Sequence, residues 1–245
     1  MTQISVALTK PDFLHLGEQI AQLKEAGADR LHLDIMDGSN DRRRVSYGRD
    51  FAQAVYDHAR SFGLHVETHM LIDRDAIADV ELYPGDTLIY HSDALGKHAH
   101  DTVVRASRRT NIPDEIKAAG KRFGLAFDIH SRPEELYDLK LTTPDGFIPL
   151  NPDQILIMTT SARMLDGRFV PDSIRKISIA CNIRNVRKKP GGKYEIAVDG
   201  CMNEENARLA REAGADVVVS GSYVLGSPNS RDAIEKLRGI VSVDA

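Results

Sequence analysis

Short apolar segments alternate with longer amphipathic segments along the chain. The short segments span five or six residues, are rich in Val, Ile and Leu, and are typical of buried strands. Eight of them stand out: Gln3–Leu8, Arg30–Ile35, His65–Met70, Thr87–His91, Arg122–Phe127, Gln154–Met158, Tyr194–Val198 and Asp216–Ser220. The longer segments repeat apolar residues at helical spacing, as in Leu14–Ala26, Asn203–Ala213 and Ser230–Leu237. Strands that alternate with helices predict right-handed βαβ units and a parallel sheet.

The number of these units favours one closed architecture. Eight strand–helix units in 245 residues fit a TIM (β/α)8 barrel, which takes about 250 residues, better than an open doubly wound sheet. We therefore predict an α/β fold in which residues 1–245 form a single catalytic domain. Two long segments are predicted to be irregular, Leu141–Asp153 and Arg184–Lys193, and the charges of the second are expected to be solvated at the N-terminal face of the barrel.

Two connections between a helix and a strand have nearly the same sequence. Lys24–Asp29 reads KEAGAD before the second strand, and Arg211–Asp216 reads REAGAD before the eighth. In each, the glycine can adopt the left-handed conformation that ends a helix. The similarity indicates a repeated structural unit, although chance reuse of a common turn is an alternative explanation.

Composition narrows the class of protein. The net charge is −4 and the pI about 6.1, so no global positive field would recruit nucleic acid or an anionic membrane. The sequence has no Trp and no apolar run near the ~18–20 residues of a membrane span. Its N-terminus lacks the pattern of a signal peptide, and its two cysteines, Cys181 and Cys201, fit free thiols in a reducing compartment. We expect a cytoplasmic enzyme.

Polar residues at strand ends carry the candidate chemistry, because catalytic groups of such barrels come from the C-terminal ends of strands. In the second strand His32 and Asp34 share one face, since side chains alternate with period two. The third strand ends with His69 and the seventh is followed by Asp199. Each residue alone also fits a satisfied core histidine or a helix cap. Together, two imidazoles and two carboxylates predict a site for one divalent ion such as Zn, Fe(II), Mn or Co.

Four stretches of the sequence form a longer pattern: His32-Leu33-Asp34-Ile35-Met36-Asp37-Gly38, His69-Met70, Asp199-Gly200 and Ser220-Gly221-Ser222. In this order they resemble the ribulose-phosphate 3-epimerase family, and the resemblance extends from about Ile4 to Leu237. The first motif is rather specific, whereas the Gly-Ser pair alone is weak. The resemblance implies a TIM barrel, in agreement with the independent strand count.

The resemblance also implies an activity and roles for the four polar residues. His32, Asp34, His69 and Asp199 match the family's ligands for one divalent metal, and Asp34 and Asp199 match its acid/base pair. The implied reaction inverts C3 of a ketose phosphate of the ribulose 5-phosphate/xylulose 5-phosphate type through an enediolate. The metal stabilises negative charge on the substrate oxygens, while one carboxylate removes a proton and the other supplies one to the opposite face.

Other matching positions imply contacts with the substrate. Met36 and Met158 match methionines that line the reaction centre, although both also fit ordinary barrel core. Gly200, Gly221 and Ser222 match part of the family's phosphate site. The implied partner is a small phosphorylated sugar, and the family implies a homo-oligomer.

The remaining part of the phosphate site departs from the family pattern. Where the family has a glycine-rich loop after the sixth strand, this chain keeps only Gly167 and carries Arg163 and Arg168. Cys201 stands where the family has a second glycine, and Arg42–Arg44 replace part of an apolar segment after the second strand. These arginines fit solvated loop charges, or an anion site rebuilt from guanidinium groups. The second interpretation predicts a different or longer sugar phosphate as substrate.

Further departures affect the same face. Ala7 occupies the place of a family serine, Leu71 that of a methionine and Asp128 that of an asparagine, whereas His91 is family-like. His98 and His100 could suggest a second metal, but we expect plain surface histidines.

Two other classes of function compete with an epimerase. A phosphate-binding decarboxylase or Schiff-base aldolase on a similar barrel needs a strand-end lysine, and none is apparent. A catalytically inactive relative that binds a ligand would fit the altered phosphate loop, but the four retained metal-site residues argue against it.

Overall fold

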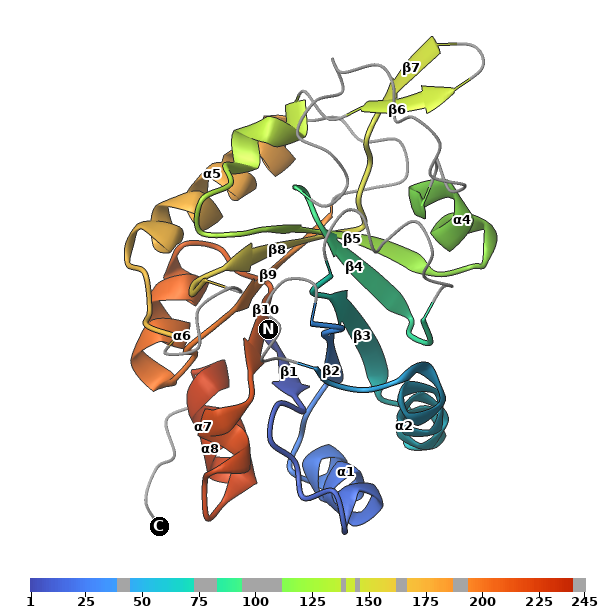
Figure 1. Ribbon diagram of the computed structural model, residues 1–245. Coiled ribbons are helices and arrows are strands. Elements are labelled where there is room, and N and C mark those ends of the chain that lie inside the picture. Colours follow the sequence, from blue (N-terminus) through green and yellow to red (C-terminus); the bar gives the residue numbers. More distant parts are fainter. Residues whose placement is uncertain are drawn as a thin grey trace.

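The eight predicted strands close into a parallel barrel, in the order β1-β10-β9-β8-β5-β4-β3-β2 (Figure 1). The computed structural model describes residues 1–38, 45–72, 83–93, 112–137, 140–143, 146–161, 167–186 and 194–239. The barrel strands are β1 (Gln3–Ala7), β2 (Arg30–Ile35), β3 (His65–Met70), β4 (Thr87–His91), β5 (Arg122–Phe127), β8 (Gln154–Met158), β9 (Glu195–Asp199) and β10 (Val217–Ser220). The predicted TIM-barrel fold is confirmed, and every strand end lies within one residue of its predicted position.

Helices lie outside the strands (Figure 1). They are α1 (Leu16–Glu25), α2 (Arg49–Ser61), α4 (Ile112–Ala118), α5 (Asp172–Val186), α6 (Glu204–Glu212), α7 (Ser222–Leu225) and α8 (Ser230–Arg238), with a 3-10 helix at Pro133–Tyr137. The side chains of Asn203 and Asn229 accept backbone N–H groups at the starts of α6 and α8, which are otherwise left without helical partners. Across the described ranges, we find no helix with the length and apolarity that a membrane crossing requires.

Two segments predicted to be irregular contain regular structure. Within Leu141–Asp153, most of an antiparallel hairpin forms, in which β6 (Lys140–Thr143) pairs with β7 (Gly146–Pro149). Its Thr-Pro-Asp-Gly sequence is a turn signal between strand-forming residues, so the prediction of an irregular segment was wrong here. Figure 1 shows the hairpin projecting beyond the barrel.

The second correction concerns the start of the Arg184–Lys193 segment. Helix α5 continues to Val186, and Arg184 is largely buried rather than solvated. Its guanidinium forms an ion pair with Asp216, so the helix end is tied to the turn before β10. Residues 187–193 lie outside the described residues.

The repeated AGAD sequence has a structural counterpart. Gly27 and Gly214 both have left-handed φ angles, +97° and +104°. The aspartates that follow them accept backbone N–H groups of the preceding barrel strand, Asp29 from Ile4 and Asp216 from Ile196. Two more aspartates in front of strands make the same bond: Asp86 accepts from Val66 and Asp153 from Phe123. This hydrogen bond therefore recurs in front of every second barrel strand, at β2, β4, β8 and β10. It fixes the start of each of these strands against the start of the strand before it.

The apolar core has two parts. The larger part fills the space between the barrel and the helices, and includes Leu33 and Ile35 of β2. The smaller part lies inside the barrel and consists of Ala7, Ile89, Ala126, Leu156, Met158, Ala197, Val217 and Val219. On β2 and β3 the inward positions carry polar residues instead, and these build the site described next.

Candidate metal centre

Four side chains predicted as metal ligands meet at the C-terminal end of the barrel. β2 supplies His32 and Asp34, β3 supplies His69, and β9 supplies Asp199. One nitrogen or oxygen from each side chain lies within 4.8 Å of those of the other three. His69 Nδ1 is 3.1 Å and His32 Nε2 is 3.4 Å from the same Asp34 Oδ1. The register of β2 and β3, which pairs Asp34 with His69, brings these residues together.

The two imidazoles are held by contacts at their other nitrogens. His32 Nδ1 lies 3.3 Å from Glu67 Oε2, and His69 Nε2 lies 2.8 Å from His91 Nε2. The His69 and His91 rings also stack, with centroids 4.9 Å apart. Both His32 and His69 are fully buried. These outer contacts leave His32 Nε2 and His69 Nδ1 directed at the carboxylates.

One atom of the cluster lacks a hydrogen-bond partner. His32 Nε2 is buried and accepts or donates no hydrogen bond, although such an orphan is costly in a protein interior. A cation bound between His32, Asp34, His69 and Asp199 would satisfy it. The donor set of two nitrogens and two carboxylate oxygens suits a borderline divalent metal.

The environment separates the pKa values of the two aspartates. Burial alone would raise the pKa of Asp34, but the adjacent His32 and His69 imidazoles hold it well below its usual range. Burial raises the pKa of Asp199 to about 6, and the charge of Asp34 adds to this effect against the opposing charges of the histidines. Two carboxylates with pKa values pushed apart are a common arrangement for acid/base work.

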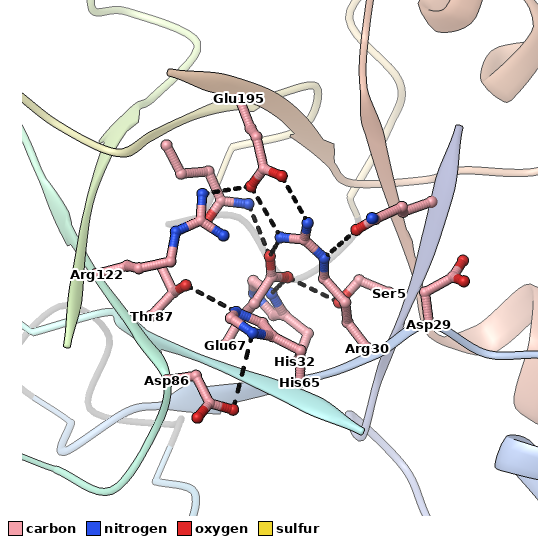
Figure 2. Close-up of polar contacts among 12 residues, drawn as sticks. Ser5, Asp29, Arg30, His32, His65, Glu67, Asp86, Thr87, Arg122 and Glu195 are labelled. Atoms are coloured by element: carbon pink, nitrogen blue, oxygen red, sulfur yellow. Dashed lines mark hydrogen bonds and ion pairs between the residues drawn. The ribbon is translucent and has the colours of Figure 1, made fainter. Parts of the chain in front are cut away.

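A buried polar network lies beneath the cluster, toward the start of the strands (Figure 2). Its centre is Glu67, whose carboxylate accepts hydrogen bonds from Ser5 (2.8 Å), Arg30 (2.8 Å) and Gln154 (2.7 Å) and contacts His32. Burial alone would raise the pKa of Glu67, but the contact with His32 and the charge of Arg30 hold it well below its usual range. No role was predicted for Glu67 from the sequence. The available signal was its period-two relation to His69, which places a carboxylate inside the barrel.

The predicted methionines have different surroundings. Met36 directly follows β2 and is partly buried, and its N–H donates to Ser46 Oγ at 2.8 Å. The Ser46 hydroxyl in turn donates to the Asp34 carbonyl, so the returning loop fixes the end of β2. Met158 ends β8, is buried inside the barrel and pairs in register with Asp199.

An aromatic hydroxyl also lies close to the cluster. Tyr47 donates its hydroxyl to the Leu8 carbonyl and stacks on Phe51. Burial raises the pKa of Tyr47 to about 12, with a further contribution from the charge of Asp34. Tyr47 was not predicted as a site residue, because no spacing signal distinguishes it from an ordinary loop aromatic.

The loops after β9 and β8 pack tightly together. Gly200 has φ +118°, and a Cβ there would lie 2.4 Å from Thr160 Cγ2, so both backbone and space require glycine. Cys201 keeps a left-handed φ of 53°, a conformation that favours the glycine expected from the family. Its Sγ lies 3.0 Å from the Gly167 carbonyl. Cys181 and Cys201 are both free, as predicted.

The loop after β10 supplies Gly221 and Ser222, which precede and begin the short helix α7. A Cβ at Gly221 would lie 2.7 Å from Thr9 Oγ1 and 3.0 Å from the Ala7 carbonyl. The loop is therefore packed against the end of β1. This close approach places it at the same end of the barrel as the cluster.

Of the predicted arginines and of His98 and His100, the structure describes only Arg168. Arg168 is exposed to solvent. Arg163, Arg42–Arg44, His98 and His100 lie outside the described residues. The anion site built from arginines thus stays a prediction.

Three of the positions that depart from the family pattern are buried at strand ends. Ala7 ends β1 inside the apolar barrel interior, and Leu71 and Asp128 directly follow β3 and β5. Lys176 of α5 donates to the carbonyls of Asp128, Ile129 and Ser131. This lysine fixes the loop after β5.

Comparison with known proteins agrees with the fold and the motifs. The sequence profile of the ribulose-phosphate 3 epimerase family matches residues 3–225. The ribulose-phosphate 3-epimerase of Chlamydia muridarum is 30% identical over 96% of this chain and 94% of its own length, and that of Bacillus subtilis is 27% identical over 98% and 99%. Among solved structures, a 3-hexulose-6-phosphate synthase has a TM-score of 0.62 at 13% identity, with 98% of this chain and 100% of that chain covered. This last likeness concerns the fold alone.

Proposed function

The chain belongs to the ribulose-phosphate 3-epimerase family, a family of isomerases, and on this basis we propose that it inverts C3 of a ketose phosphate through an enediolate. The ribulose 5-phosphate/xylulose 5-phosphate pair is the first candidate for substrate and product. The convergence of His32, Asp34, His69 and Asp199 at the C-terminal end of the barrel carries the proposal. In barrels of this kind the active site lies at that end.

One divalent cation is part of the proposal. His32 Nε2, His69 Nδ1 and a carboxylate oxygen from each aspartate would hold Zn, Fe(II), Mn or Co, and the unpartnered His32 Nε2 supports this. When bound, the cation would stabilise the negative charge that develops on the substrate's carbonyl and neighbouring hydroxyl oxygens. Glu67 and His91 would hold the two imidazoles in place for binding.

Asp34 and Asp199 are proposed as the acid/base pair. They project from β2 and β9, two strands separated around the barrel by β1 and β10, and can therefore approach a substrate from different sides. In one direction, the charged Asp34 takes the C3 proton, and protonated Asp199 supplies a proton to the opposite face of C3. The product then has the opposite configuration, and the reverse reaction exchanges the two roles. The separated pKa values of the two carboxyl groups support this division.

The phosphate end of the substrate is proposed to lie toward Gly200, Gly221 and Ser222, with Met36 and Met158 lining the reaction centre. These residues follow or end β9, β10, β2 and β8, at the same end of the barrel as the four predicted ligands. Arg163 and Arg168 are proposed to contact the anion, in place of the family's glycine-rich loop. The altered loop supports the alternative of a different or longer sugar phosphate.

Proton exchange at C3 tests the proposal directly. The purified protein would be stripped with a chelator, reloaded with each of the four metals in turn, and incubated in D2O with a panel of ketose phosphates. We expect metal-dependent deuterium incorporation at C3 and formation of the epimer, both visible by NMR. Metal-loaded protein that exchanges no C3 proton in any substrate would favour the inactive, ligand-binding alternative. Efficient turnover of ribulose 5-phosphate alone would rule out the changed-substrate alternative.

The assembly and location of the protein are further parts of the proposal. We propose a homo-oligomer, and the exposed apolar side chains of Phe13, Leu14 and Val45 support it as surfaces that a second copy could cover. Light scattering coupled to gel filtration would measure the mass, and a monomer would contradict it. A cytoplasmic location stays a prediction that the two free thiols support.

A further inference from the structure

Glu67 joins the buried network at the start of the strands to the proposed metal centre (Figure 2). Its side chain is fully buried, and its two oxygens divide the contacts between them. Oε1 accepts from Arg30 Nη1 and Gln154 Nε2, while Oε2 accepts from Ser5 Oγ and faces His32 Nδ1. A carboxylate held in this way has little freedom to move.

Arg30 in turn is held by three side chains, of which Glu67 is one. Its Nε donates to Gln3 at 2.6 Å. Its Nη2 donates to Glu195 at 2.9 Å, and its Nη1 donates to Glu195 at 3.2 Å and to Glu67. Only 4% of the Arg30 side chain is exposed, so its position is set by these bonds rather than by solvent. Glu195 also accepts from Arg122 at 2.5 Å. Arg30 thus pairs with two carboxylates, of which Glu67 also contacts His32 and Glu195 contacts Arg122 instead.

The geometry has a chemical consequence for His32. A carboxylate can only accept hydrogen bonds, so the 3.3 Å contact requires a proton on His32 Nδ1. In the neutral imidazole, the lone pair is then on Nε2, the buried atom that faces Asp34 and has no hydrogen-bond partner. The opposite tautomer would direct an N–H at the place proposed for the cation.

We infer that Glu67, locked by Arg30, Ser5 and Gln154, is a positioning residue that selects the His32 tautomer able to bind a divalent cation. The inference rests on the proposed metal-dependent function and deepens it. Glu67 itself touches neither cation nor substrate, and acts through the orientation and protonation of His32. Partners of this kind typically change metal affinity by about 10- to 100-fold when they are replaced.

The test compares two isosteric replacements in the same network. Glu67→Gln removes the carboxylate beside His32, and can present an amide N–H to Nδ1. Glu195→Gln removes the other carboxylate and leaves the Glu67–His32 contact in place. Co(II) affinity of the metal-free full-length proteins would be measured by competition with a chromogenic chelator, together with the visible absorption bands of the bound Co(II).

For Glu67→Gln we expect Co(II) to bind about 10- to 100-fold more weakly with altered absorption bands, and for Glu195→Gln we expect wild-type affinity and bands. Equal affinity of wild type and Glu67→Gln, or equal weakening by both replacements, would overturn the positioning role and leave the metal centre standing. Wild-type protein that takes up no Co(II), Zn, Mn or Fe(II) would overturn the proposed function and this inference with it.

Ser5→Ala decides the matter if Glu67→Gln does not fold. It removes the hydroxyl that donates to Glu67 Oε2 and keeps the carboxylate itself. The free energy of unfolding of metal-free Ser5→Ala would be compared with that of metal-free wild type. If the two values are equal and the variant binds Co(II) more weakly, the positioning role is supported. Unchanged binding and unchanged absorption bands contradict it.

Discussion

The interior of this barrel has two unlike sides. Inward positions of β4, β5, β8 and β10 carry apolar side chains through the middle of the barrel, such as Ile89, Ala126, Leu156 and Val219. Inward positions of β2 and β3 are polar along their whole length, from Arg30 and Glu67 up to the cluster at the C-terminal end. β9 joins the two sides, since Ala197 belongs to the apolar cluster while Asp199 reaches the proposed ligands.

The contrast shows how one barrel can separate stability from chemistry. Burial of apolar surface stabilises one side without any need for exact partners. The polar side is stable only when each buried group has a partner, because an unpaired charge in the interior is strongly destabilising. His32 Nε2 remains unpaired there, which marks the place where a ligand is expected.

The largest effect should come from the acid/base pair on the polar side. Asp34→Asn or Asp199→Asn keeps the side-chain shape, and we expect the rate of epimerisation to fall by about 10²- to 10⁴-fold with the fold retained. Turnover and circular dichroism would be measured together. Asp57→Asn, an exposed change on α2, serves as the control with unchanged rate. Near-wild-type epimerisation by either site variant would refute the assignment.

A cavity on the apolar side should lower the stability of the fold and leave metal binding unchanged. Leu156 is fully buried inside the barrel, and Leu156→Ala should lower the free energy of unfolding by about 2–5 kcal/mol. Urea denaturation would measure this loss, and Co(II) titration would show affinity close to wild type. Strong loss of Co(II) binding in a protein that is still folded would show that the two sides are not independent.

Metal removal should sharpen the comparison, because the proposed cation site lies at the end of the polar side. Zn(II) at about 100 times its dissociation constant should stabilise the protein by about 2.7 kcal/mol, and a chelator should reverse this. Thermal unfolding with and without Zn(II) measures the shift. Asp34→Asn is expected to lose most of it, and an equal shift in that variant would place the cation elsewhere.

The smallest effect is expected from Glu195, at the partly exposed edge of the network. Burial alone would raise its pKa, but hydrogen bonds from Arg30 and Arg122 hold the pKa of Glu195 below its usual range. Its ionised form therefore stabilises the fold above the unfolded-state pKa of about 4.3, and this contribution is lost as pH falls through the lower folded-state value. Glu195→Gln should cost about 1 kcal/mol at neutral pH.

The pH dependence provides the check on this last prediction. Urea denaturation of wild type and Glu195→Gln should differ at neutral pH and converge as the pH falls through the lowered folded-state pKa of Glu195. Glu205→Gln, an exposed change on α6, should show no such difference. A gap between wild type and Glu195→Gln that stays constant with pH would mean that the ion pair does not stabilise the fold.

The sequence by itself determined the architecture and the four polar side chains that meet at the C-terminal end of the barrel. Strand positions were predictable because most strands are short apolar runs, and because the KEAGAD and REAGAD turns mark where two of the strands begin. His32 and Asp34 were visible because period-two alternation places both on the inward face of one strand, where a polar residue needs a hydrogen-bond partner or a bound ion. His69 and Asp199 were visible because each lies at a strand end.

The tertiary structure decided which residues support that site. Glu67 and Arg30 are 37 residues apart and Arg30 and Glu195 are 165 apart, so no local pattern could pair them. Only closure of the barrel, which sets β2 beside β3 and brings the first residues of distant strands into one buried layer, makes Arg30 a partner of both carboxylates. The spacing of residues along one strand determines which polar side chains point into the barrel. Which side chains they pair with depends on the register between strands.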